Sequence, residues 1–444
     1  MFSVLAILLP AVHNNPPPPD AVPPTTENSR LSPGFSRVLV LLFLSVFINY
    51  IDRSNLSIAA PLIKDELGIS ASQLGILLSA FFWTYATCQI LSGWLVDRFD
   101  VKWVFAAGFF LWSSATAVTG LVHSLALLTV VRVVLGIGES VAFPGYSKIL
   151  ATHCPEGRRG FANSIITAGL ALGPSFGLLF GGTLVAHYGW RPFFIVIGSV
   201  CLLWVLPWMR WMPAADMTTR VHNSGPGMRE ILRQRSAWGT FLGLFCGNYF
   251  LYFTVTWLPF YLVRERHLSM TAMAKVGGGY FLVAAISSGL SGWSSDRWIR
   301  AGYTPTVVRK TFLAVGCLGS GLFLLATVLA PLQWSILWLM VTGVFFGFSA
   351  SNVWAVTQRL AGPRAVGRWC GLQLFVSNSS GVVAPAVTGL LLDRTGQFFW
   401  PFLVVSVVLW IAVLPWIFVV GPIEPVEWGQ PDSALIKAEP AFSN

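Results

Sequence analysis

The sequence predicts an all-α membrane protein in which twelve transmembrane helices form two six-helix bundles. Of the 444 residues, 55% are hydrophobic and only 10% are charged, and the mean hydropathy is +0.68. This profile is typical of a polytopic membrane protein and excludes an ordinary soluble enzyme. Apolar stretches of about 20 residues, long enough to cross a bilayer as helices, occur near 37–60, 72–95, 102–121, 125–150, 161–186, 192–211, 238–262, 272–293, 311–330, 333–357, 368–391 and 399–420.

The basic residues follow the positive-inside pattern. The formal net charge is +10, but these residues are spread over alternate loops, so we expect no nucleic-acid partner. Because Lys and Arg favour cytoplasmic loops, the basic loops and both termini are expected to be cytoplasmic. The basic loops carry Arg98, Lys102, Lys148, Arg158, Arg159, Arg210, Arg220, Arg229, Arg233, Arg235, Arg297, Arg300, Arg309, Lys310, Arg359, Arg364 and Arg368.

Two tails and a linker accompany the bundles. We expect a disordered Pro-rich tail over 1–35, a first bundle over 36–211, a cytoplasmic linker over 212–236, a second bundle over 237–420 and a polar, mobile tail over 421–444. The six cysteines are scattered without metal-ligand or redox spacing, and we expect them to act as small hydrophobic residues. No metal site, catalytic constellation or cofactor is predicted.

The second half of the chain repeats motifs of the first half in the same order. The matching stretches are "SGWLVDRF" at 92–99 with "SGWSSDRW" at 291–298, residues 158–174 with 366–385, and "GWRPFFIV" at 189–196 with "FWPFLVV" at 399–405. Three ordered repeats indicate a duplication. They predict two related bundles around a pseudo-two-fold axis normal to the membrane.

These motifs carry a family resemblance over about residues 36–420. The stretch "GWLVDRFDVK" resembles the loop motif G-x-L-x-D-R-x-G-R-K of the major facilitator superfamily, although Asp100 replaces the second glycine and Val101 the following basic residue. The stretches "INYIDRSNLSIAAP", "FFWTYATCQILSGWLVDRF", "RVVLGIGESVAFP", "TWLPFYL" and "GWRPFF" are similar to the anion:cation symporter family of sialin, phthalate, hexuronate, glucarate and galactonate transporters. The resemblance implies the major facilitator fold and transport of an organic anion.

Four ionisable residues lie inside predicted spans: Asp52 and Arg53 in the first, and Arg132 and Glu139 in the fourth. Charge inside a membrane is costly, so such residues are candidates for function. Arg132 and Glu139 are about two helical turns apart and project from one face, which must look into the bundle. Asp52 and Arg53 point about 100° apart, so one is expected to face the central cavity and the other a neighbouring helix.

The residue types suggest a division of labour. The planar fork of Arg53 matches a carboxylate, so we expect it to bind an anionic substrate. Burial disfavours the charged form of a carboxylate and a nearby arginine favours it, so Asp52 and Glu139 are the expected proton carriers, with Arg132 as the partner of Glu139. The family resemblance implies the same roles. An alternative is an ion-pair cluster that only locks two helices together, and the sequence leaves open whether Asp52 or Glu139 dominates.

Polar and aromatic residues near these charges suit a polyhydroxylated or aromatic acid. The candidates are Tyr50, Tyr85, Gln89, Asn248, Ser351, Trp354, Gln373 and Asn378. The resemblance to sugar-acid transporters implies substrate contacts at Tyr50 and Tyr85, and near Gln373 and Asn378. Each residue could instead make an ordinary interhelical hydrogen bond. Because Leu244 and Phe245 precede Cys246 where sugar-acid members often carry a glutamine, the exact substrate stays open.

Two Asp-Arg pairs are expected to act as gates. Asp97-Arg98 and Asp296-Arg297 end the second and eighth spans, where the aspartate can accept hydrogen bonds from the N-terminus of a helix in the other half. The alternative is a solvated salt bridge of little value. A separate motif, "GLALGPSFG" at 169–177, fits a fifth-helix pattern of drug antiporters, but it also reads as ordinary close packing.

The sequence therefore predicts a proton-coupled secondary transporter that imports an organic anion by alternating access. The expected substrate is a sugar acid such as a hexuronate, aldonate or aldarate, or another small carboxylate. The expected partners are this anion, protons and the lipid bilayer, and the expected form is a monomeric, multi-pass protein of the plasma membrane. The alternatives are a proton-coupled antiporter that exports a small molecule and, from another class, a solute receptor or a membrane enzyme.

Overall fold

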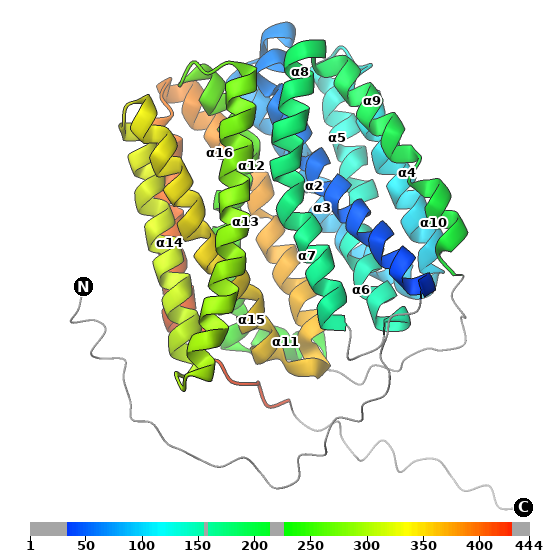
Figure 1. Ribbon diagram of the computed structural model, residues 1–444, viewed down its shortest axis with the longest axis vertical. Coiled ribbons are helices and arrows are strands. Elements are labelled where there is room, and N and C mark those ends of the chain that lie inside the picture. Colours follow the sequence, from blue (N-terminus) through cyan, green and yellow to red (C-terminus); the bar gives the residue numbers. More distant parts are fainter. Residues whose placement is uncertain (1–32, 155–158, 214–225, 429–444) are drawn as a thin grey trace, which may run out of the picture.

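Twelve segments form helices that are long and apolar enough to cross a membrane, and they confirm the predicted spans. A computed structural model describes residues 33–154, 159–213 and 226–428, and all regular structure in these residues is helical (Figure 1). The first half of the chain contains α2 (Pro33–Leu67), α3 (Ala71–Arg98), α4 (Val101–Thr119), α5 (Leu125–Glu139), α6 (Ala142–His153), α7 (Arg159–Phe176), the π-helical segment η3 (Gly177–Gly181), α8 (Gly182–Tyr188), α9 (Trp190–Leu202) and α10 (Val205–Trp211).

The second half begins with a short helix and then crosses six more times. Its elements are α11 (Met228–Arg233), α12 (Arg235–Arg264), α13 (Met270–Arg300), α14 (Pro305–Leu329), α15 (Leu332–Asn378), α16 (Ser380–Thr395), α17 (Phe399–Leu414) and the π-helical segment η4 (Pro415–Val419). Gly362 divides α15 into two spans, because its φ of 63° is a conformation that glycine adopts readily and other residues avoid.

An even number of crossings returns the chain to the end of the bundle where it starts. We call this end, at which α2 begins and η4 finishes, the terminal end, and the other the opposite end. The terminal end is at the bottom of Figure 1, where α11 also lies. Helix caps set the turns between spans: Ser70 and Gln73 form a capping box at the start of α3, and Thr304 caps α14.

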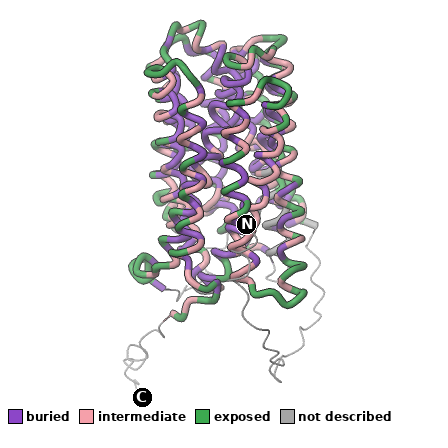
Figure 2. Tube along the Cα trace, turned by 90° about the vertical axis from the view of Figure 1, so that its left-hand side faces the viewer, coloured by how far each residue is buried: buried purple, intermediate pink, exposed green. Residues whose placement is uncertain are grey.

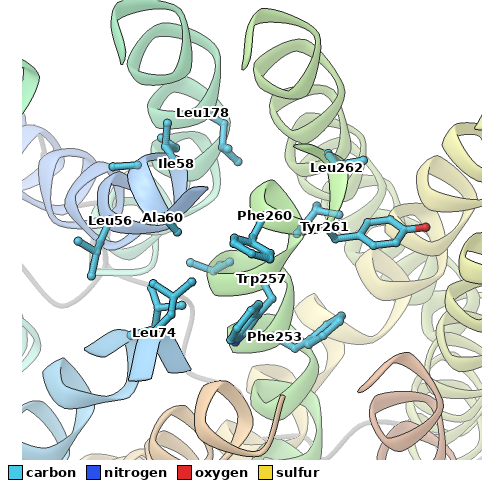
Figure 3. Packing of buried hydrophobic residues seen from close by; sticks show 14 of the residues in the cluster. Leu56, Ile58, Ala60, Leu74, Leu178, Phe253, Trp257, Phe260, Tyr261 and Leu262 are labelled. Carbon is cyan, nitrogen blue, oxygen red and sulfur yellow. The ribbon is translucent and has the colours of Figure 1, made fainter. Parts of the chain in front are cut away.

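Buried residues fill the interior of the bundle and exposed residues follow its outer surface (Figure 2). Many of the exposed residues are large and apolar, such as Leu206 and Phe418, as expected for helices surrounded by lipid. One buried cluster joins the two halves. In Figure 3, Leu56 and Ile58 of α2 and Leu74 of α3 lie on one side, and Trp257 and Phe260 of α12 lie on the other.

Two expectations about the linker and the C-terminal tail need correction. The last part of the predicted linker folds as α11, whose Ile231 is fully buried in a cluster with the second half. The first eight residues of the predicted mobile tail, 421–428, are docked: Val426 N–H donates to Leu360 O at 2.9 Å and Trp428 Nε1 to Ala361 O at 3.0 Å. Hydrophobic side chains explain both differences, because burial of Ile231 and Trp428 favours order. Residues 1–32, 214–225 and 429–444, which make up the rest of the tails and linker apart from a few described flanking residues, lie outside the described ranges.

The "GWRPFF" motif has a structural role at the opposite end. Arg191 donates to Glu66 of α2 at 2.8 Å and to the carbonyl oxygens of Gly120 and Val122, where α4 ends. Trp190 Nε1 donates to the same Glu66 carboxylate at 2.7 Å. The motif thus holds the ends of α2 and α4 against the start of α9.

Candidate functional site

Arg53 and Glu139 form an ion pair at mid-height in the bundle. Arg53 Nε of α2 lies 3.5 Å from Glu139 Oε2 at the end of α5, and the Glu139 side chain is completely buried. At this distance the two groups attract each other without a hydrogen bond. The sequence predicted Arg132 as the partner of Glu139; Arg132 does lie within electrostatic range of this carboxylate, and Arg53 is the nearer cation.

Aromatic rings surround the Arg53 guanidinium. Its Cζ lies 4.7 Å from the ring centre of Tyr50, 4.3 Å from that of Tyr85 and 5.4 Å from that of Phe81. Cation–π attraction offsets part of the cost of removing a guanidinium from water. Buried Nη2 of Arg53 has no hydrogen-bond partner among the described residues, so a donor is free at this position. A carboxylate is the natural acceptor for such a donor.

Asp52 faces the interior of the first half instead. Its Oδ1 accepts a hydrogen bond from Asn55 Nδ2 at 2.9 Å, and the carboxylate interacts electrostatically with Arg132. Arg132 also interacts with Glu139, so it lies within electrostatic range of both carboxylates. The adjacent residues Asp52 and Arg53 therefore face different surroundings, as their angular separation on the helix predicts.

A cluster of unsatisfied polar atoms lies around these two acids. Buried side-chain atoms without a hydrogen-bond partner in the described part of the chain include both amide atoms of Asn49, Oδ2 of Asp52, Oδ1 of Asn55, Nε1 of Trp112, Oγ of Ser113, Oγ1 of Thr116, Nε of Arg132 and both oxygens of Glu139. Buried polar groups normally find partners, so this region is suited to bound water or to a proton that moves between sites. Hydropathy alone did not single out Asn49, Ser113 and Thr116, because single polar residues hardly change a window average.

The second half contributes a tyrosine–asparagine pair. Tyr252 of α12 donates from its hydroxyl to Asn378 Oδ1 at 2.6 Å, and its ring centre lies 4.3 Å from that of Phe82 in the first half. Tyr252 also interacts electrostatically with Arg53. The pair therefore lies across the boundary from the guanidinium. Asn378 was predicted from the sequence. Tyr252 lies four residues after Asn248, another predicted residue, and so shares its helix face.

Four other predicted site residues differ in their surroundings. Gln373 faces its own half, where Thr357 donates to its Oε1 and its Nε2 donates to Thr240 O, so it is a packing residue here. Trp354 packs against the cluster around Trp369, and Ser351 lies beside Gly292 of α13. Gln89 is half-buried, with a buried Nε2 that has no partner among the described residues, and it interacts with Tyr85.

Asn248 is half-buried. Its side chain has no hydrogen-bond partner among the described residues. Its predicted substrate role therefore rests on its position four residues before Tyr252, on the same face of α12.

Of the predicted gate residues, Arg98, Asp296 and Arg297 make no hydrogen bond or ion pair between the two halves within the described residues. Asp296 pairs with Arg309 of its own half, and Arg309 Nη1 also donates to Ser295 and Asn352 at 2.8 Å. Arg98 and Arg297 are exposed, and the Asp97 side chain lies outside the described residues. The physical reason for the Asp296 result is proximity: α14 starts directly after α13 and places Arg309 within reach.

The expected helix-capping contact occurs at the opposite end. Asp393, near the end of α16, accepts hydrogen bonds from the backbone N–H groups of Ala71 and Ser72 at 2.8 and 2.7 Å, in the first turn of α3. Arg264 of α12 pairs with Asp65 of α2 and donates to Pro61 O at 3.2 Å. Near the terminal end, no hydrogen bond or ion pair joins described residues of the two halves.

Comparisons with known proteins agree with this geometry. The model of the Major Facilitator Superfamily matches residues 42–385. A probable sulfoacetate transporter of Cupriavidus necator is 32% identical, with 86% of this chain and 93% of that protein covered. The D-galactonate transporter of Escherichia coli is 30% identical (89% and 98% covered), and the hexuronate transporter of Bacillus subtilis is 28% identical (87% and 94% covered).

A solved structure shares the fold. A bacterial homologue of the human lysosomal transporter Spinster, in an inward-facing and unoccupied conformation, superposes with a TM-score of 0.76 at 20% identity, and the match covers 88% of this chain and 98% of that one. At this identity the likeness concerns the fold alone.

The ion pair between Arg53 and Glu139 leads to a stability prediction. Arg53→Gln leaves a buried carboxylate without its partner, so we expect unfolding in detergent to become easier by about 3 kcal/mol. Adding Glu139→Gln should recover at least half of this loss. The partly exposed pair of Arg309 and Asp296 is the control, and its neutralisation should show a smaller coupling of about 1 kcal/mol. Strictly additive effects of Arg53→Gln and Glu139→Gln would show that the two groups do not interact.

Proposed function

The chain belongs to the major facilitator superfamily, and we propose that it imports a small organic anion together with protons by alternating access. It is a transporter rather than an enzyme, and a multi-pass protein of the plasma or inner membrane. Its relatives are named as sulfoacetate, galactonate and hexuronate transporters, which supports an anionic substrate that carries a carboxylate or sulfonate. One copy of the chain contains every residue that the proposal uses, so we propose a monomer.

The free Nη2 donor of Arg53 is the observation that carries the substrate proposal. It belongs to a buried cation at the boundary between the halves, with Tyr50 and Tyr85 on one side and Tyr252 on the other. An anion at this position gains a charge-assisted hydrogen bond and contacts with tyrosine rings. The Tyr85 hydroxyl, the Tyr252 hydroxyl oxygen as an acceptor and Asn378 Nδ2 as a donor would meet the polar part of a sugar acid, since the Tyr252 proton is already donated to Asn378 Oδ1.

Coupling to protons follows from competition for Arg53. Glu139 lies 3.5 Å from Arg53 and has no hydrogen-bond partner among the described residues. When a substrate carboxylate binds the guanidinium, Glu139 loses its attraction, and a lone buried carboxylate is costly enough to take up a proton. Asp52 and Arg132 repeat this arrangement deeper in the first half, so Asp52 is a candidate for a second proton. Substrate and proton then travel together.

We propose that the terminal end faces the cytoplasm, since it carries the basic loops. The opposite end then faces outward and is closed by two polar contacts, Asp393 with the start of α3 and Arg264 with Asp65. These groups are exposed, so each contact contributes little and can break during transport. Close packing supports them, because a Cβ added at Gly75 would lie 2.6 Å from Pro385 O. We call these contacts the outer latch.

Export by an antiporter receives no specific support from the fifth-span motif. Its glycines pack α7 against α2: a Cβ added at Gly173 would lie 2.5 Å from Tyr50 Cβ, and one at Gly177 would lie 2.5 Å from Ser54 Oγ. Ser175 of the same motif donates to Gly278 O of α13 at 2.9 Å. The motif is therefore explained by helix packing.

Substrate binding by Arg53 is tested in proteoliposomes with labelled sulfoacetate, galactonate and hexuronate. At least one should accumulate. Arg53→Ala should abolish uptake, and Arg53→Lys should reduce it at least about tenfold, because the planar fork is lost. Arg394→Lys, an exposed change, is the control and should transport normally. Normal binding of the anion by Arg53→Ala would contradict the substrate role.

Proton coupling is tested by comparing net uptake with exchange. Glu139→Gln should lose most accumulation driven by a pH gradient, since a neutral amide cannot carry the proton, while exchange of internal for external substrate continues. Wild-type uptake should also stop when an ionophore collapses the gradient. Undiminished uptake after this collapse would rule out symport while leaving anion transport in place.

The outer latch predicts local opening at the opposite end. In Asp393→Ala we expect amide hydrogen exchange to become about fivefold faster both at residues 71–75 and at residues 257–264 in the other half. This factor corresponds to a decrease of roughly 1 kcal/mol in the free energy of local opening. Asp296→Ala breaks a partly exposed pair within one half and is the control. If only residues 71–75 respond, Asp393 is a simple helix cap and not a latch.

A further inference from the structure

One face of α13 carries exposed apolar residues along most of its length. Ile286 is 56% exposed, Leu290 59% and Trp293 57%, and Leu282 continues the same row. Their spacing of three and four residues places them on one face of the helix. An apolar face on a membrane-spanning helix is covered by lipid chains. In Figure 1, α13 lies on the near side of the bundle.

The other faces of α13 are occupied by protein. Ser287 donates to Val344 O at 2.6 Å and Ser291 to Phe348 O at 2.9 Å, both on α15. Gly278 O accepts from Ser175 of α7. The exposed row is thus the part of the helix surface that neither neighbour covers.

At the terminal end this row continues into two arginines. Arg297 and Arg300 follow Trp293 by four and seven residues, and both are exposed. They line a hollow of about 420 Å³ together with Trp293 and Ala301. The Arg297 Cζ lies 5.4 Å from the Trp293 ring centre, so indole and guanidinium are stacked beside the hollow.

The positive charge of this hollow is not neutralised by the neighbouring acid. Asp296 is engaged by Arg309, which Ser295 and Asn352 hold in place. Arg300 Nε donates only to the Asp296 backbone oxygen, at 3.4 Å. Among the described residues, no carboxylate lies within salt-bridge distance of Arg297 or Arg300. Two guanidinium groups therefore remain available for an external anion.

We propose that this hollow binds the headgroup of an anionic phospholipid in the leaflet at the terminal end. The phosphate would lie between Arg297 and Arg300, since guanidinium forks match phosphate oxygens. Trp293 would occupy the interface, where indole is favoured, and an acyl chain would follow Leu290 and Ile286 along the helix. Along α13 the arginines, the interfacial Trp293 and the apolar row therefore follow the order of the phosphate, the interfacial region and the acyl chain in a phospholipid.

The first half offers a matched site that lacks one arginine. Trp94 and Arg98 of α3 hold the equivalent positions in the repeated motif, and both are exposed. The position equivalent to Arg300 holds Val101, which is buried. A single arginine cannot contact a phosphate from two sides. We therefore expect the stronger lipid site at α13.

Native mass spectrometry of full-length protein extracted from vesicles with equal phosphatidylglycerol and phosphatidylethanolamine tests the proposal. Wild type should retain phosphatidylglycerol preferentially. The Arg297→Gln, Arg300→Gln double variant should retain about thirtyfold less, the scale expected for two arginines at an anionic surface. Arg98→Gln should change retention less than about twofold. The double Lys variant at 297 and 300 keeps the charge and should fall between wild type and the double Gln variant.

Several results would overturn the assignment. Equal losses in Arg98→Gln and in the double Gln variant would mean that retention follows net charge. Unchanged retention in a double Gln variant with wild-type melting temperature would exclude the site. Displacement of phosphatidylglycerol by inorganic phosphate at matched concentration would identify a phosphate site without lipid specificity. These readouts need no transported substrate, so they do not depend on the proposed function.

Discussion

The cost of keeping charged groups inside a membrane is the constraint on which the rest of this structure depends. The Arg53 and Glu139 side chains are buried in membrane spans, where water cannot hydrate them. Each charge must therefore be stabilised by the other and by its surroundings. Tyrosine and phenylalanine rings surround the guanidinium, while the carboxylate has two arginines within electrostatic range and no hydrogen-bond partner among the described residues. We propose that this difference prepares the cation to bind an anion and the carboxylate to take up a proton. A fully bonded pair would be stable and inert.

The two halves share a fold but differ in what they contribute. The first half holds all four intramembrane charges, and the second half offers Tyr252 and Asn378 across the boundary. The contacts between the halves also differ in kind. In the outer latch, the Asp393 carboxylate of α16 caps α3, whereas α7 and α13 are joined by a hydrogen bond from Ser175 to a backbone oxygen. We therefore propose that proton and substrate binding depend mainly on residues of the first half.

Hydropathy and repeats were sufficient to predict the spans, and helical periodicity was sufficient to place Arg132 and Glu139 on an inward face. The pairing of Arg53 with Glu139 was not predictable, since it depends on how α2 packs against α5. For the same reason the sequence predicted Gln373 as a site residue, although its amide makes its hydrogen bonds to Thr357 and Thr240 within its own half. The Asp393 cap was not predictable from the motifs that repeat between the halves, because Asp393 lies outside them, although Asp393-Arg394 is also an Asp-Arg pair at a helix end. Which helix N-terminus an aspartate meets is a property of the assembled bundle.

The central claim is that substrate and Glu139 compete for Arg53, so that anion binding and protonation are one event. Calorimetric titration of purified protein with a transported anion, repeated in buffers of different ionisation enthalpy, measures the protons taken up on binding. The account predicts uptake of about one proton per anion in wild type and a clear loss of that uptake in Glu139→Gln. Binding of the anion by wild type with no proton uptake at neutral pH would contradict it.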